Sequence, residues 1–413
     1  MVVRSTSWLG LGYFTYFFSY GIFLPFWSVW LQGEGITPAM IGILLAIGLV
    51  SRFLGSLFIS SSVKNPTKLI SALRFLALLS LLFVISFAFD SHWLWISFAM
   101  IGFNLFFAPL VPLSDALAGT WQKQFTFDYG NVRVWGSIAF IISSALTGML
   151  MSASGIDFGA GISFSFDKIN HWIGANLFGH HHIILVFLIF SVAIMLLGMM
   201  LKPSIMPEGT VTEGKTTEKA VNSVSFRKLL SEKSVWQFLL CVTLLQAAHA
   251  GYYSFSSIYW EKAGYSSATI GYLWSLGVVA EVIVFTFSKR LFRGWGARSL
   301  LLLSAICGVV RWGLMGTFTE LPILIVIQIL HCGTFTVCHL AAMRFIGARN
   351  ENEVIRLQSV YSALAMGGGI AVMSAVGGFL YEYTGGGIYW VMALVALPAI
   401  FLRPKNESHI HSV

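Results

Sequence analysis

Two stretches of the chain, GEGITPAMIGILLAIGLVSR (Gly33–Arg52) and KAGYSSATIGYLWSLGVVAE (Lys262–Glu281), match in one unbroken register at an offset of 229 residues. Three pairs of glycines coincide in this register: Gly35 with Gly264, Gly42 with Gly271 and Gly48 with Gly277. A second match aligns Val132–Arg133 with Ile355–Arg356 at an offset of 223. The alternative is chance similarity between apolar segments, which three glycines in step disfavour. The sequence therefore predicts an internal duplication.

The repeated stretches lie in a chain that is apolar throughout. Hydrophobic residues make up 57% of it and charged residues 10%, against about 25% charged residues in soluble domains. A helix needs about 20 apolar residues to cross a bilayer. Twelve such segments are predicted, at about 8–30, 38–60, 69–88, 93–119, 129–152, 183–201, 235–259, 266–290, 297–317, 321–346, 353–381 and 386–402.

Six of these segments separate the two copies, and an even number leaves both copies running in the same direction. We therefore expect an all-α membrane protein, with twelve transmembrane helices in two parallel six-helix repeats. The predicted domains are residues 1–201, with an outer loop at 152–182, and residues 234–413. A polar segment, 202–233, has the composition of a cytoplasmic linker.

The placement of Lys and Arg predicts the orientation of the chain. If the N-terminus is cytoplasmic, only Lys168 and Lys262 lie outside, and Arg52, Arg133 and Arg311 lie at membrane depth, so 20 of the 25 basic residues lie inside. We expect both termini in the cytoplasm of a bacterial cell, and the chain in its inner membrane. No cleavage site follows the first residues, so the first helix is expected to stay in place. The dispersed basic residues do not predict binding to nucleic acid.

Two acidic residues, Asp115 and Glu281, fall inside these apolar segments. A charge at bilayer depth costs roughly 2.5–3.5 kcal/mol or more, so it usually pairs with another charge and marks an ion or substrate path. Asp115 and Arg133, 18 residues apart across a tight helix connection, are expected to lie at the same depth and pair. Arg311 is the expected counter-charge of Glu281. The alternative for each pair is a fixed structural ion pair.

Glu281 has aliphatic neighbours, and burial among them favours the neutral form of a carboxylate, which suits reversible protonation. His331 and His339 lie eight residues apart on one predicted helix, about 80° apart around it. Either could relay a proton, or each could be a histidine hydrogen-bonded between helices. His249 is a weaker candidate of the same kind. Arg52 could meet a substrate carboxylate, although an interface role or snorkelling is the more ordinary explanation.

Aromatic residues crowd the first and seventh predicted helices. The mid-span tyrosines Tyr16, Tyr20 and Tyr253 would suit a cavity for a substrate with an aromatic ring, although packing alone also explains each one. No nucleotide-binding loop and no nucleophile–base arrangement is found, so neither an ATP-driven pump nor an enzyme is expected. No cofactor is expected.

Two further groups of residues contain metal-ligating side chains. Cys332 and Cys338 lie near the histidines of the same helix, but their spacing fits no zinc pattern, and we predict no metal there. The loop 152–182 ends in His180, His181 and His182. A metal or pH role is one interpretation of this triplet, and a solvated loop is the favoured one.

The chain resembles the major facilitator superfamily, within it the branch of proton symporters that includes lactose permease. The segment YGNVRVWG and the acid before it correspond to that branch's substrate-binding acid and arginine, at Asp115 and Arg133. AEVIVF, VVRWG and QILHCGT place a coupling glutamate at Glu281, an arginine at Arg311 and a histidine at His331. The branch has a proton-carrying glutamate three residues after that histidine, where this chain has Thr334. The resemblance therefore leaves Glu281, His331 and His339 as candidate proton carriers.

Within the superfamily, GYFTYFFSYGIFLPFWSVWL, SLGVVAEVI and HCGTFTVCHLAAMRF are similar to transporters of 3-phenylpropionate-type acids from enteric bacteria. The resemblance implies a monomer that imports an aromatic carboxylate with a proton by alternating access. We expect Arg133, Arg311 or Arg52 to hold the carboxylate and the mid-span aromatics to hold the ring. The alternatives are a proton-coupled symporter for a sugar or nucleoside, and a nontransporting sensor or channel.

Overall fold

The computed structural model describes residues 2–152, 156–157, 163–164, 181–208 and 230–404. His180, most of the 152–182 loop and much of the predicted linker lie outside the described residues. The contacts divide the chain into two compact units. Unit 1 comprises residues 1–210 and 253–278, and unit 2 comprises residues 211–252 and 279–413. The boundaries 201 and 234 of the two predicted domains stay a prediction.

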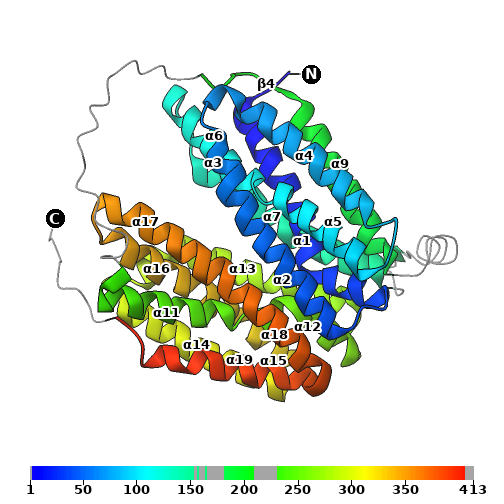
Figure 1. Cartoon of the computed structure of the whole chain (residues 1–413), viewed down its shortest axis with the longest axis vertical. Coiled ribbons are helices and arrows are strands. Elements are labelled where there is room, and N and C mark those ends of the chain that lie inside the picture. The colour runs from blue at the N-terminus through cyan, green and yellow to red at the C-terminus, as the bar shows by residue number, and fades with distance from the viewer. Residues whose placement is uncertain (1, 153–155, 158–162, 165–180, 209–229, 405–413) are drawn as a thin grey trace. The chain divides into compact units, whose positions relative to one another are not determined.

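Unit 1 is built from long helices. Its elements, in chain order, are β1 (Val2–Val3), α1 (Ser5–Gly33), α2 (Pro38–Leu54), η1 (Gly55–Ile59), α3 (Ser60–Ser62), η2 (Pro66–Lys68), α4 (Leu69–Ser86), α5 (Trp93–Phe107), α6 (Leu110–Gln124), α7 (Tyr129–Met151), β2 (Ile156–Asp157), β3 (Ser163–Phe164), α9 (His182–Met200) and β4 (Lys202–Pro203). Helix α1 packs against α7 and α9, α2 packs against α5, and α4 lies beside both α5 and α9 (Figure 1). The two strand pairs are parallel β1–β4 and antiparallel β2–β3, two residues each.

The next two helices, α12 (Ala250–Lys262) and α13 (Ser267–Leu291), each contribute residues to both units. The other elements of unit 2 are α11 (Lys233–Ala247), α14 (Ala297–Thr317), α15 (Leu321–Ile329), η3 (Cys332–Thr336), α16 (Val337–Gly347), α17 (Glu351–Tyr361), η4 (Ser362–Gly368), α18 (Gly369–Thr384), η5 (Gly385–Gly387), α19 (Ile388–Ala396) and η6 (Leu397–Ile400). Helix α14 packs against α16 and α19, and α11 packs against η4 and α18.

Eleven helical stretches of the described residues are long and apolar enough to cross a membrane. The last of them, Arg356–Ile400, covers most of the two predicted spans 353–381 and 386–402. It is interrupted at the 3₁₀ turn η5, where Gly385 has a φ of 53°. The structure therefore supports a bundle of membrane-spanning helices, and the number twelve stays a prediction.

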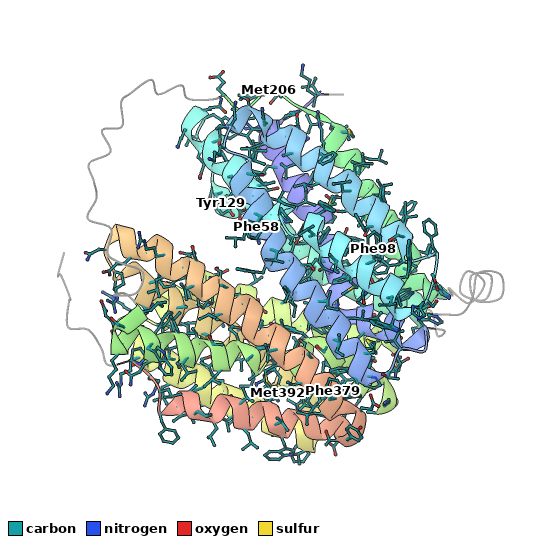
Figure 2. All side chains as sticks on the ribbon, viewed as in Figure 1. Phe58, Phe98, Tyr129, Met206, Phe379 and Met392 are labelled. Carbon is teal, nitrogen blue, oxygen red and sulfur yellow. The ribbon has the colours of Figure 1, made fainter. Side chains whose placement is uncertain are left out.

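The surface of these helices is apolar, as lipid-facing surfaces are. Phe58 is 64% exposed, Phe98 52% and Phe379 50% (Figure 2). Large exposed apolar patches on a soluble protein would mark an interface. Here exposed apolar side chains occur along most of the helices, whereas polar side chains such as Gln246 and Gln328 are fully buried. This distribution is what a polytopic membrane protein requires.

The two copies of the repeat end their preceding helices in the same way. Gly35 has a φ of 79° and Gly264 a φ of 92°, a left-handed conformation that glycine adopts without strain. Ile36 N–H donates to Leu31 O over 3.1 Å, and Tyr265 N–H donates to Trp260 O over 3.0 Å. Both pairs are the six-residue hydrogen bond of a Schellman cap. The glycines that match in sequence at this position therefore have one shared backbone role.

Several helices are interrupted within the predicted spans. Helices α5 and α6 are separated at Ala108 and Pro109, where the proline pair Pro109 and Pro112 predicts a kink. A turn at Ala248 and His249 separates α11 from α12. A third break ends α15 before His331 and continues as the π-helical turn η3. Such π-helical turns are frequent at functional sites. The π-helical segments η1 and η4 lie in two other spans, so a π-turn alone does not mark the site; two of these three breaks also lie at histidines that the sequence singled out.

Candidate functional site: a histidine bridge in unit 2

In unit 2, His331 lies between an acid and a base. Its Nε2 is 2.6 Å from Oε1 of Glu281 on α13. Its Nδ1 is 2.8 Å from Nη1 of Arg311 on α14. Glu281 and Arg311 do not form a direct ion pair among the described residues, so the expected pairing is corrected: the imidazole ring stands between them. The three side chains form one bridge from carboxylate to guanidinium.

These contacts fix the tautomer of His331. A guanidinium only donates hydrogen bonds, so Nδ1 of His331 must accept, and the proton of the neutral ring lies on Nε2. That proton is donated to Glu281, which accepts as a carboxylate. A proton cannot enter at Nδ1 while Arg311 donates there. Of the Glu281 carboxylate and the His331 imidazole, only the carboxylate can take up a proton without breaking a hydrogen bond between the three residues.

Thr334 extends the bridge to a second histidine. Its Oγ1 accepts from Nη1 of Arg311 over 3.0 Å and lies 3.0 Å from Nε2 of His249. Nδ1 of His249 lies 2.9 Å from the carbonyl oxygen of Leu245, and because a carbonyl only accepts, the ring proton of His249 lies on Nδ1. The single hydroxyl proton of Thr334 is then shared between Nε2 of His249, at 3.0 Å, and the carbonyl oxygen of His331, at 3.1 Å. We call these five residues, Glu281, His331, Arg311, Thr334 and His249, the polar bridge.

The breaks in the helices present these side chains to one another. His249 lies at the turn between α11 and α12, His331 is the N-cap residue of the π-helical segment η3, and Thr334 is its third residue. A π-turn shifts the rotation of the following residues relative to an α-helix. Arg311 lies in the middle of α14, and its Nε donates to Ile327 O over 2.9 Å. Its guanidinium also lies 4.5 Å from the ring centre of Tyr252.

The polar bridge is buried except at one end. Arg311 is 0% exposed and His249 is 1% exposed. The Glu281 side chain, in contrast, is 16% exposed. Glu281 is therefore the most exposed member of the polar bridge.

His339 lies outside the polar bridge. Its Nδ1 is 3.4 Å from the hydroxyl of Tyr361, and its ring lies 6.2 Å from that of Phe285. These contacts resemble those of a histidine held between helices. Its predicted role in proton coupling stays a prediction.

In unit 1, Asp115 does not pair with Arg133. Oδ1 of Asp115 accepts from the Tyr13 hydroxyl over 2.5 Å and from the Tyr129 hydroxyl over 2.7 Å (Tyr129 is labelled in Figure 2). The Arg133 guanidinium lies over aromatic rings, 4.3 Å from the centre of Phe17 and 5.1 Å from that of Tyr13. The predicted ion pair is wrong because two tyrosine hydroxyls satisfy the acid and ring faces hold the base. Tyr13 joins the two, through its hydroxyl and its ring.

A second cation in unit 1 also lies on an aromatic ring. The Arg52 guanidinium is 4.7 Å from the ring centre of Tyr20. Tyr16 lies beside Tyr20, with ring centres 6.4 Å apart, and stacks on Phe107 at 4.3 Å. The structure therefore brings three predicted substrate-binding residues together. Tyr253, predicted with them, stacks on Trp274 with ring centres 6.3 Å apart.

Three residues of these clusters were not predicted as site residues: Thr334, Tyr13 and Tyr129. Thr334 follows His331 by one helical turn, and Tyr129 precedes Arg133 by four positions, spacings that place side chains on one helix face. A buried acid also needs hydrogen-bond donors. The spacing alone could have found Thr334, and both signals together could have found Tyr129. Tyr13 had no such signal, because α1 contains many aromatic residues.

Comparison with known proteins agrees with this architecture. The profile of the MFS_1 like family matches residues 6–392. The chain is 60% identical to the probable 3-phenylpropionic acid transporter of Escherichia coli, over 98% of this chain and 99% of that protein. It is 22% identical to a sucrose permease of Escherichia coli, over 96% and 93% of the two chains. The crystal structure of the nucleoside transporter NupG superposes with a TM-score of 0.77, at 12% identity and over 97% and 98% of the two chains.

The family profile covers nearly the whole chain. The 60% sequence identity to the Escherichia coli transporter is high enough to show that the two proteins belong to one family. The NupG likeness shows the fold alone. The chain therefore belongs to the MFS_1 like family of the major facilitator superfamily, and it is a multi-pass membrane transporter.

Proposed function

We propose that this transporter imports 3-phenylpropionate or a similar aromatic carboxylate together with a proton, by alternating access. The observation that carries the proton step is the position of His331 between Glu281 and Arg311. The substrate is inferred from the relative that is 60% identical. In this proposal both termini lie in the cytoplasm, the chain acts as a monomer, and the membrane is the bacterial inner membrane.

The charge of the polar bridge couples the proton to an anion. With Glu281 as a carboxylate, its negative charge balances the positive charge of Arg311. When Glu281 takes up a proton, a guanidinium that is 0% exposed loses its counter-charge. An uncompensated buried charge costs several kcal/mol, so the protonated transporter favours a bound anion. Release of the anion in turn favours loss of the proton, and the two therefore travel together.

The carboxylate of the substrate needs a cation, and three arginines are available in this proposal: Arg311 in unit 2, and Arg52 and Arg133 in unit 1. Arg52 and Arg133 are already on aromatic faces. A phenyl ring can pack against such faces, and the guanidinium edge still donates to a carboxylate. An arginine beside tyrosines therefore suits both ends of an aromatic acid.

A sugar or nucleoside symporter is the main alternative. Such ligands are recognised by amide and hydroxyl groups. The Asn104 amide donates to Met100 O over 2.9 Å, and Oε1 of Gln328 accepts from the Tyr252 hydroxyl over 2.9 Å, whereas the buried Gln246 amide makes no hydrogen bond to the described residues. The preference for the aromatic acid therefore rests on the relative that is 60% identical. Intramembrane charges held in a bridge disfavour a passive channel, which has no need of a proton-switched group.

Transport in proteoliposomes tests the proposal. Labelled 3-phenylpropionate should accumulate when the interior is more alkaline than the exterior, and unlabelled aromatic acids should compete while sugars and nucleosides should not. Collapse of the pH gradient with a protonophore should abolish accumulation. Equal accumulation with and without the gradient would show that transport is not coupled to protons. Competition by a nucleoside but not by aromatic acids would show that the substrate is a nucleoside.

A further inference from the structure

The turn after α1 meets the start of α9 at a cluster of metal-ligating side chains that the transport function does not use. Oε1 of Glu34 lies 3.2 Å from Nε2 of His181 and 3.3 Å from Nδ1 of His182. The two imidazole rings lie 4.2 Å apart. All three ligand atoms lie within 4.8 Å of one another. We propose that Glu34, His181 and His182 bind a divalent transition metal, with Zn²⁺ as the best fit.

The distances between Glu34 and the two histidines fit a metal site and are longer than a charge-assisted hydrogen bond. A charge-assisted N–H···O bond measures about 2.7–2.9 Å, and both contacts here are longer. Ligands at 2.0–2.1 Å from a tetrahedral zinc ion lie about 3.3–3.4 Å from one another. The two Glu34–histidine distances are close to this edge length. The two imidazole nitrogens need only turn towards each other to complete one face of a tetrahedron, leaving a fourth position for water.

Glu34 is itself set up as a ligand. Its side chain is 8% exposed, and its Oε1 accepts no hydrogen bond from the described residues. The other oxygen, Oε2, accepts a hydrogen bond from the Ser91 hydroxyl. A hydrogen bond of this kind orients a ligating carboxylate and leaves the other oxygen for the metal. A buried acceptor without a donor is otherwise costly.

The histidines are placed by the helix ends. His181 is the N-cap residue of α9, and His182 is its first residue. Gly33, the last residue of α1, has no side chain, and a Cβ there would overlap the His181 ring. The His181 and His182 side chains are 25% and 23% exposed, so an ion from solution can reach them. Two imidazoles and a carboxylate are ligands that suit Zn²⁺.

Metal binding to the full-length chain, purified without a histidine tag, tests the proposal. Equilibrium dialysis against Zn²⁺ followed by elemental analysis should give one ion per chain, and Co²⁺ should give the intense visible spectrum of a tetrahedral site. His181→Gln, His182→Gln and Glu34→Gln should each weaken binding at least about tenfold. His92→Asn, which removes a histidine next to Ser91 and keeps its capping role, should bind as the parent does.

Two variants keep every ligand and test the geometry. Ser91→Ala should weaken Zn²⁺ binding about 10–100-fold by freeing the orientation of Glu34. Gly33→Ala should weaken it by displacing the His181 ring. Each variant should still take up labelled 3-phenylpropionate in metal-free buffer, which shows that it is folded. Absence of a stoichiometric ion in the parent chain, or equal affinity in the histidine variants, would overturn the proposal.

Discussion

The guanidinium of Arg311 donates a hydrogen bond to Nδ1 of His331 over 2.8 Å, and this single contact assigns the protons of the polar bridge. Because Arg311 occupies Nδ1, the ring donates through Nε2 to Glu281 at 2.6 Å. In the proposed mechanism, the histidine transmits the state of the carboxylate to the arginine and does not carry the transported proton; Glu281 carries it.

Glu281→Gln should abolish accumulation driven by the pH gradient. The amide oxygen can still accept from Nε2 of His331, but the side chain cannot release a proton. Exchange of internal for external substrate, which needs no net proton movement, should persist. Counterflow and gradient-driven uptake in the same proteoliposomes measure the two properties, and full accumulation by the variant would exclude Glu281 as the carrier.

His331→Gln should retain part of the proton-coupled uptake, whereas His331→Leu should lose it. A glutamine amide can accept from Arg311 through its oxygen and donate to Glu281 through its nitrogen, which reproduces the neutral ring, but it cannot ionise. Leucine does neither, so Glu281 and Arg311 each lose their hydrogen bond to residue 331, although Arg311 keeps its bonds to Thr334 and Ile327 O. Initial rates of gradient-driven uptake compare the two variants. If both lose coupling while both still exchange substrate, His331 must ionise during transport.

Thr334→Val should destabilise the protein by about 1–3 kcal/mol for each buried group that loses its partner. Valine has nearly the shape of threonine but can neither accept from Arg311 nor donate to His249. Thr334→Ser keeps the hydroxyl and is the matched control, with a smaller expected loss. Thermal unfolding in detergent gives the comparison, and equal stability of the valine variant and the parent would show that Thr334 is not part of the bridge.

Tyr13→Phe and Tyr129→Phe should each cost about 1.5–3 kcal/mol, because each removes a hydrogen bond to the charged Asp115. Tyr383, which is 83% exposed, supplies a control: Tyr383→Phe should change stability by less than about 0.5 kcal/mol. Denaturant unfolding in mixed micelles measures the free energy of unfolding of the three tyrosine variants. If only Arg133→Gln lowers it and the tyrosine variants do not, Asp115 pairs with Arg133 instead of with the tyrosines.

Arg52→Gln and Arg133→Gln separate the candidate holders of the substrate carboxylate. A hydrogen bond between the arginine and the substrate carboxylate contributes about 1.5–3 kcal/mol. Its loss should raise the KM for 3-phenylpropionate about 10–150-fold in the variant that lacks the arginine that binds the carboxylate. The neutral 3-phenylpropanamide should inhibit the parent and that variant equally, because it has no carboxylate. If neither variant changes KM, Arg311 is left as the holder among the three.

The sequence predicted the parts of this structure that depend on local pattern. The glycine pair Gly35 and Gly264 marked the internal repeat, and burial of charge marked Glu281 and Arg311. Contacts that depend on helix rotation could not be predicted. Asp115 and Arg133 were placed at one depth, but depth alone does not make two side chains face each other.

The position of His339 relative to His331 could not be predicted either, because the helix that carries them is not regular. A regular helix would place His331 and His339 near one face, about 80° apart. The structure instead has the π-helical turn η3 between them, and only His331 lies in the polar bridge. The proline kink near Pro109 was predictable because proline has no amide hydrogen, whereas π-turns have no comparable sequence signal.

The most direct test of the central claim is the protonation of His331 itself. In protein labelled with ¹⁵N-histidine, with the signal assigned through His331→Gln, nitrogen NMR should show a neutral ring with the proton on Nε2. This state should persist across the pH range in which the transporter binds its proton, while an infrared difference spectrum shows protonation of Glu281. A signal from a doubly protonated imidazolium over that range would contradict the account.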